Sequence, residues 1–189
     1  LDSNTTGNRN TATGANSLKV NTTGDDNVAI GYDALRSNTT GIKNVAIGNY
    51  SMDALTTGSE NTGLGYSALG ANTTGGSNNA IGYFALSSNT TGGYNAAFGN
   101  SSMNANTTGD NNIAIGHLSL TANTTGTRNI ALGSGALDAP DTENDNLAIG
   151  YDALGGSIAG GEFNVAIGNY SLDALTSGDK NTGVGYNAL

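Results

Sequence analysis

A short repeat runs through the whole chain. An asparagine, a brief apolar segment and a glycine recur at a spacing of 17, with a single step of 18 between Asn146 and Asn164. The anchoring asparagines are Asn10, Asn27, Asn44, Asn61, Asn78, Asn95, Asn112, Asn129, Asn146, Asn164 and Asn181. A fixed short period indicates stacked, nearly identical units that contact only their neighbours. The repeat therefore predicts a solenoid rather than a globular fold.

The first part of each repeat has the pattern of a β-strand. With the asparagine as position 0, position 2 is always Ala or Gly, position 1 is often β-branched, and position 3 is apolar except at Thr13. Alternation over a short segment bounded by glycine predicts a strand. Because successive side chains point to opposite faces, we expect positions 1 and 3 to face the interior. The small residue at position 2 would then point outward, where another chain could pack closely.

The rest of the repeat predicts a second short strand and two turns. Position 4 is Gly and position 8 is Leu or Met in all eleven units, and positions 11–14 read Asn-Thr-Thr-Gly in most of them. Asn and Gly are typical turn residues, and an invariant Gly indicates a backbone angle or close approach that a Cβ would prevent. Each repeat thus predicts one coil of a parallel β-solenoid. At roughly 4.8 Å per coil, eleven coils give a rod of about 53 Å.

Stacking is expected to align identical side chains into ladders along the rod. The predicted ladders contain Asn27, Asn44, Asn61, Asn78, Asn95, Asn112, Asn129, Asn146 and Asn164; Ile30, Ile47, Ile81, Ile115, Ile149 and Ile167; Gly31, Gly48, Gly82, Gly116 and Gly150; and Leu35, Leu69, Leu86, Leu120, Leu137 and Leu154.

The array is expected to form one domain, residues 1–189, with an irregular loop at about 138–163, where the only proline and the inserted residue lie. Leu1 and Leu189 occupy the same phase of the repeat, which predicts a piece of a longer fibre. A coil with so few apolar residues would struggle to offset its backbone entropy. We therefore expect several chains to associate through the Ala/Gly face.

Composition excludes several kinds of partner. The net charge of −9 argues against nucleic acid, because nothing could neutralise a run of phosphates. The apolar runs are too short to cross a bilayer, so we expect no membrane contact within this segment. The absence of cysteine removes disulfides and thiolate metal sites. No cofactor is expected.

The apolar segments resemble those of a known family. Asn-Val-Ala-Ile-Gly at 27–31, 44–48 and 164–168, Asn-Ile-Ala-Ile-Gly at 112–116 and Asn-Leu-Ala-Ile-Gly at 146–150 resemble the head repeats of trimeric autotransporter adhesins. The longer unit with Asn-Thr-Thr-Gly is similar to repeats in trimeric fibres of phages and predatory bacteria. The resemblance implies a left-handed parallel β-roll, three of which pack side by side as an extracellular adhesive trimer. The period of 17 is longer than is usual in the autotransporter heads.

Catalytic and metal sites have little support in the sequence. The single histidine, His117, has no nucleophile or carboxylate at a consistent spacing, so it is interpreted as a solvent-facing variant and no enzyme is predicted. Asp138, Asp141, Glu143 and Asp145 are weak candidate ligands for Ca²⁺, which prefers oxygen ligands from a flexible loop. A solvated cluster of charges is the favoured interpretation.

Three repeated features are candidates for surface contacts. Tyr32, Tyr66, Tyr83 and Tyr151 share position 5 and could contact sugars or a protein, although packing against neighbouring coils is favoured. Seven Asn-Thr-Thr strings, at Asn4, Asn21, Asn38, Asn72, Asn89, Asn106 and Asn123, fit the N-glycosylation rule, but turn chemistry explains them equally well. The Thr rows at positions 12 and 13 suggest an ice-binding face, which interruptions at 141–142 and 159–160 disfavour.

These observations favour a structural or adhesive segment of an extracellular, homotrimeric fibre on a cell surface. The expected partners are further copies of the chain and an unidentified receptor, either glycan or protein. A viral tail or surface fibre is the alternative within the structural class. A monomeric ligand- or ice-binding solenoid is the alternative from another class.

Overall fold

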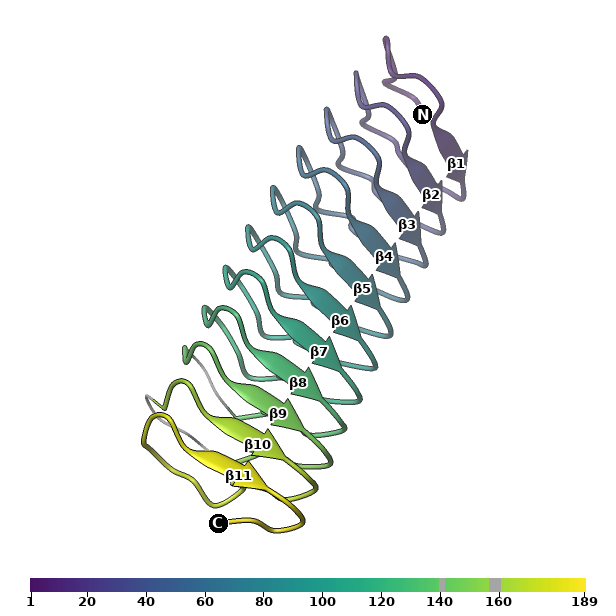
Figure 1. Cartoon of the computed structure of the whole chain (residues 1–189). Helices are drawn as coiled ribbons and strands as arrows, with labels where there is room; N and C mark the ends of the chain where they lie inside the picture. The colour runs from purple at the N-terminus through teal and green to yellow at the C-terminus, as the bar shows by residue number, and fades with distance from the viewer. Residues whose placement is uncertain (140–141, 157–160) are drawn as a thin grey trace.

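The computed structural model describes residues 1–139, 142–156 and 161–189. These residues form a single 11-stranded sheet in which the strands follow one another in chain order (Figure 1). The strands are β1 (Thr11–Thr13), β2 (Val28–Ile30), β3 (Val45–Ile47), β4 (Thr62–Leu64), β5 (Asn79–Ile81), β6 (Ala96–Phe98), β7 (Ile113–Ile115), β8 (Ile130–Leu132), β9 (Leu147–Ile149), β10 (Val165–Ile167) and β11 (Thr182–Val184). Within the described residues there is no helix. The chain is an all-β parallel β-solenoid in which each turn takes up one repeat of the sequence.

Every strand pairs in parallel with the next at the same repeat positions, as Ala29 of β2 does with Ala46 of β3. The longer step between Asn146 and Asn164 does not shift this register, because Leu147 of β9 still pairs with Val165 of β10. The loop expected at 138–163 contains residues 140–141 and 157–160, which lie outside the described residues. The described sheet therefore continues through the irregular region of the sequence.

The prediction of two strands per coil is wrong, since each coil contributes one three-residue strand in the described part of the chain. The second apolar segment consists of turns. Leu118 and Leu120, at positions 6 and 8, both lie in the left-handed region, with φ of 56° and 50°. Alternating left-handed residues prevent an extended chain. The backbone still joins successive coils there, because Leu120 N donates to Ala136 O at 3.0 Å.

The predicted inside and outside of the strand are reversed. Ala29 and Ala114, at position 2, are fully buried, whereas Ile30 and Ile115, at position 3, are 39% and 44% exposed. The interior is already occupied by the position-8 row, which is fully buried from Leu18 to Leu154. Only a methyl group or a hydrogen fits between that row and the strand. The Ala/Gly row therefore lines the core, and the Ile row lies outside.

Two coils show how closely the strand packs against the turns on the other side of the core. Position 2 is Gly63 in β4 and Gly183 in β11, and in both places a serine from the preceding coil fills the space. Ser51 Oγ donates to Gly63 O at 2.9 Å, and Ser171 Oγ donates to Gly183 O at 3.0 Å. A Cβ built on Gly63 would lie 2.6 Å from Ser51 Oγ. Ala at position 2 is thus the largest residue that most coils accommodate.

The glycine at position 4 closes each strand where two coils approach most tightly. Gly116 has φ of +139°, and a Cβ built on it would overlap Gly133 O in the next coil. Both the backbone angle and the close approach therefore require glycine.

Candidate functional site

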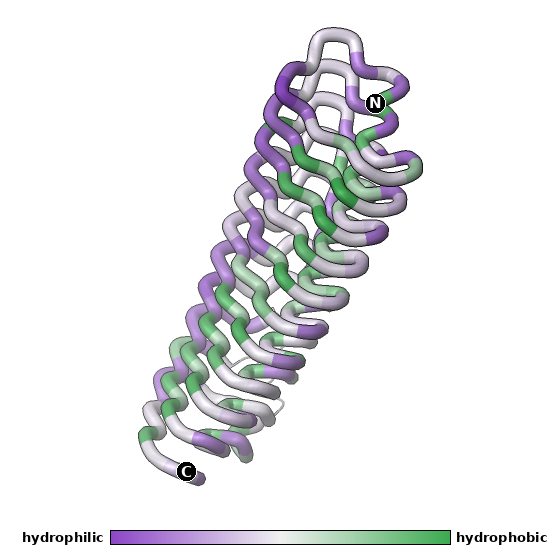
Figure 2. Tube along the Cα trace, turned by 90° about the vertical axis from the view of Figure 1, so that its right-hand side faces the viewer, coloured by the Kyte–Doolittle hydropathy of each residue, from purple (hydrophilic) through white to green (hydrophobic). Residues whose placement is uncertain are grey.

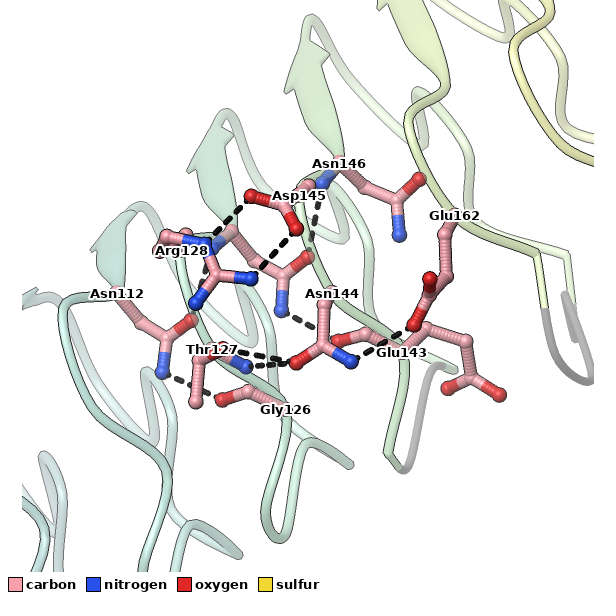
Figure 3. Close-up of polar contacts among 10 residues, drawn as sticks. Asn112, Gly126, Thr127, Arg128, Glu143, Asn144, Asp145, Asn146 and Glu162 are labelled. Atoms are coloured by element: carbon pink, nitrogen blue, oxygen red, sulfur yellow. Dashed lines mark hydrogen bonds and ion pairs between the residues drawn. The ribbon is translucent and has the colours of Figure 1, made fainter.

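The asparagines at position 0 form a buried ladder of hydrogen bonds that joins the coils. Asn112 Nδ2 donates to Asn95 Oδ1 at 3.2 Å and to Gly126 O at 2.8 Å, the second contact being drawn in Figure 3. Asn112 Oδ1 in turn accepts from Asn129 N at 2.9 Å. Each side chain therefore ties three neighbouring segments together. A buried amide with this many partners stabilises the stack rather than forming a binding site.

A second buried asparagine ladder runs along position 11, which the sequence pattern alone assigned to turns. Asn38 Nδ2 donates to Asn21 Oδ1 at 2.8 Å, and Asn106 Nδ2 donates to Asn89 Oδ1 at 2.8 Å. The side chains of Asn21, Asn38, Asn72, Asn89, Asn106 and Asn123 are buried, while Asn4 is exposed. An amide held inside the rod cannot carry a glycan, so six of the seven Asn-Thr-Thr strings are closed to glycosylation in the folded chain.

This second ladder is interrupted where a leucine replaces the asparagine. Leu55 occupies position 11 of its coil and is fully buried. Asn38 Oδ1, one coil before, is buried without a hydrogen-bond partner. In an unbroken ladder, the asparagine at position 55 would donate to that oxygen.

We expect Leu55→Asn to change the free energy of unfolding by less than about 1 kcal/mol, because the lost apolar burial is offset by new bonds to Asn38 Oδ1 and Asn72 Nδ2. The same change at position 8, Leu69→Asn, has no ladder to join and should cost more than about 3 kcal/mol. Denaturant unfolding of both variants measures the difference. If both variants lose the same free energy of unfolding, the asparagine ladder does not determine which residues position 11 tolerates.

The outer face of the sheet is an uncharged, largely apolar surface along the whole rod. We call it the sheet face and define it by positions 1 and 3 of every strand. Its members are Thr11, Val28, Val45, Thr62, Asn79, Ala96, Ile113, Ile130, Leu147, Val165 and Thr182, with Thr13, Ile30, Ile47, Leu64, Ile81, Phe98, Ile115, Leu132, Ile149, Ile167 and Val184. Figure 2 shows apolar residues returning at the same place in successive coils as stripes along the rod. None of these side chains is charged.

Many of the charged residues lie in the turns just before the strands. Arg128 makes two hydrogen bonds to Asp145 in the next coil, both of 2.7 Å, and lowers the pKa of that carboxyl (Figure 3). Arg9 pairs with Asp26 in the same way and lowers its pKa. These pairs are exposed, so each contributes little to stability.

Among the candidate calcium ligands, Asp138, Glu143 and Asp145 belong to the described residues, and these three are not grouped as a metal site. Asp145 is held by Arg128, and Asp141 lies outside the described residues. Glu143 Oε2 accepts from Thr142 N at 2.9 Å. Among the described residues there is no group of three or more His, Asp or Glu side chains that could hold a metal ion.

The remaining candidates lie on the surface. His117 is exposed at position 5. In the Thr rows, the first threonine turns its hydroxyl to the backbone, as when Thr90 Oγ1 donates to Thr107 O at 3.0 Å. In the inner coils the first threonine is half-buried and the second, such as Thr91, is exposed, so the turn presents one row of exposed hydroxyl groups there. Tyr32, Tyr66, Tyr83 and Tyr151 are exposed and contact other aromatic rings.

No family model, curated protein or solved structure matches the chain. The described part of the chain also lacks any helix of the length and apolarity needed to cross a membrane. The class of molecule that the geometry defines is a β-solenoid repeat protein with one apolar outer face.

Proposed function

We propose that the chain is a structural segment of an extracellular homotrimeric fibre that mediates attachment, and that the sheet face is where the copies pack. The observation that carries this proposal is the apolar outer surface of a parallel sheet. All-parallel sheets occur mostly with both faces covered, and strands covered on both faces are apolar on both sides. Here the chain's own turns cover one face.

A second copy suits the other face better than an unrelated partner does. The sheet face repeats with the spacing of the coils, so another rod of the same period meets it in the same register at every coil. About ten strand spacings of roughly 4.8 Å give a contact some 48 Å long. The number of copies, three, rests on the resemblance to trimeric autotransporter heads and phage-like fibres.

The role of such a fibre is mechanical. A rod joined coil to coil by buried amide ladders is stiff and holds a binding end away from the surface that bears it. Weak contacts repeated along its sides give high avidity when their spacing matches the target. A viral tail fibre would use the same geometry.

Single cysteines test this proposal, because the chain has none of its own. Ile115→Cys places a thiol on the sheet face, and Thr108→Cys places one in the Asn-Thr-Thr-Gly turn; both positions are exposed in a single chain. We expect the thiol at 115 to resist maleimide in the native protein while the thiol at 108 reacts promptly. Equal reaction rates would contradict packing through the sheet face.

A further inference from the structure

Aromatic rings form two matching clusters at the corner that follows the strands. In the coils of β2–β4, the Tyr32 and Tyr50 rings lie 5.4 Å apart at 77°, and the Tyr50 and Tyr66 rings 5.7 Å apart at 73°. In the coils of β9–β11, Tyr170 contacts Tyr151 at 5.4 Å and 74°, and Tyr186 at 5.9 Å and 86°. Each cluster thus contains three tyrosines in the same edge-to-face arrangement, and the first continues from Tyr66 to Tyr83 and Phe84.

The polar residues around the rings are repeated as well. Tyr32 N donates to Asn49 Oδ1 at 3.0 Å, and Tyr151 N donates to Asn169 Oδ1 at 2.9 Å. The first tyrosine site is Tyr32, Asp33, Asn49, Tyr50, Asp53 and Tyr66; the second tyrosine site is Tyr151, Asp152, Asn169, Tyr170, Asp173 and Tyr186.

The fold does not require aromatic rings at this corner. The coils of β6, β7 and β8 carry Asn100, His117 and Ser134 at position 5, yet they keep the same backbone. Leu118 N donates to Asn100 O at 3.1 Å, as Tyr170 N does to Tyr151 O at 2.9 Å. The tyrosines are also accessible, with Tyr151 47% and Tyr186 77% exposed.

Both sites have a negative electrostatic environment. Burial, the neighbouring Tyr32 and Tyr66, and then Asp33 and Asp53 raise the pKa of Tyr50. Asp152 is the largest cause of the raised pKa of Tyr151. Aromatic faces beside carboxylates attract cations, and a planar guanidinium both stacks on rings and pairs with carboxylates.

The two sites differ in whether the chain supplies its own cation. At position 9, the coils of β1 and β2 carry Lys19 and Arg36, and the charge of Arg36 opposes the rise that burial causes in the pKa of Asp53. At the corresponding places beside the second site, the coils of β8 and β9 carry Asp138 and Gly155. The second site therefore has an aspartate where the first has Lys19, and a glycine where the first has Arg36.

A hollow of about 290 Å³ lies where the arginine side chain is missing. It is lined by Asp138, Asp152, Gly155, Gly156, Tyr170 and Asp173. Three carboxylates and a tyrosine therefore surround a space with no lysine or arginine among its lining residues.

We propose that the second tyrosine site binds an arginine side chain of a partner polypeptide, in the place that the chain's own Arg36 occupies beside the first site. The guanidinium enters the hollow, pairs with the carboxylates of Asp152 and Asp173 and lies against the Tyr170 ring. All residues of the second tyrosine site belong to one chain, so binding there does not require the copies to assemble. The inference extends the proposed attachment role.

The probe is a fluorescein-labelled peptide with four arginines separated by glycines, followed by fluorescence anisotropy at about 0.15 M salt. A peptide with citrulline in place of arginine has the same shape without the charge. We expect Tyr151→Asn combined with Tyr170→Ser to weaken binding of the arginine peptide about tenfold. The matched first-site variant, Tyr32→Asn with Tyr50→Ser, should change it less than about twofold.

A second variant separates the hollow from net charge. Gly155→Arg should weaken binding about tenfold by filling the hollow, whereas Ser88→Arg, an exposed site with the same change of charge, should not. Circular dichroism confirms that each variant is folded, and light scattering reports assembly separately. The proposal is overturned by equal binding of the citrulline peptide, by no effect of either second-site variant, or by binding of a neutral β-linked hexose oligomer instead of the peptide.

Discussion

Replacing one ladder asparagine in the middle of the rod, Asn112→Ala, should lower the free energy of unfolding by about 2–6 kcal/mol. Asn112 accepts from Asn129 N at 2.9 Å and donates to Gly126 O at 2.8 Å and Asn95 Oδ1 at 3.2 Å. Truncation leaves Asn129 N without a partner, which costs about 1–3 kcal/mol. Gly126 O keeps its bond from Asn123 Nδ2 at 3.1 Å and Asn95 Oδ1 keeps its bond from Asn112 N at 2.9 Å, so each of these two lost bonds costs only about 0.5–1.5 kcal/mol. Denaturant unfolding followed by circular dichroism measures the loss.

The chain provides a matched control for this substitution. Asn79 lies at position 1 of β5 and is exposed, and the next strand has Ala96 at the same position. In the dissociated chain, Asn79→Ala should therefore change the free energy of unfolding by less than about 0.5 kcal/mol. A loss at Asn112 as small as that at Asn79 would mean that the ladder does not hold the coils together.

Placing charges on the sheet face, Ile81→Lys with Ile115→Lys, should raise the dissociation constant of the assembly at least about 100-fold. Both isoleucines are partly exposed in a single chain, at 37% and 44%, so the isolated rod tolerates lysine there. In a packed interface the same ammonium groups would be buried without partners. The average mass in solution as a function of concentration, measured by sedimentation, gives the constant.

Thr91→Lys with Thr108→Lys makes the same change of charge on exposed residues of the Asn-Thr-Thr-Gly turns. This control should leave the assembly unchanged. If the two double variants dissociate alike, net repulsion rather than the sheet face governs association.

The period of the sequence predicted most of the fold. A regular repeat of this length specifies the stacking of coils, the parallel pairing and the register of the described strands. Alternation within the strand showed that positions 2 and 3 face opposite sides, but not which side is the core. Hydrophobicity favoured the isoleucine, yet the buried Leu row leaves room only for Ala29 and its equivalents. The lack of any residue larger than Ala at position 2 was the available signal.

Other features gave no usable signal in the pattern. Leucine rarely adopts a left-handed conformation, so nothing indicated that Leu120, with φ of 50°, ends a turn rather than continuing a second strand. The asparagines of the second amide ladder begin the Asn-Thr-Thr-Gly strings, which are typical of turns. The pattern therefore did not indicate that their side chains are buried. The duplicated tyrosine sites did leave a signal, because they are visible when residues 27–66 are set against residues 146–186 coil by coil.

The mass of the purified chain in solution, measured by light scattering coupled to size exclusion, tests the fibre account most directly. The account predicts a mass near three times 18.8 kDa, with the sheet face covered by the other copies. A particle of 18.8 kDa that keeps its β circular dichroism at all concentrations would contradict it. The rod would then be a monomer with an open apolar face, and a ligand-binding solenoid would become the better account.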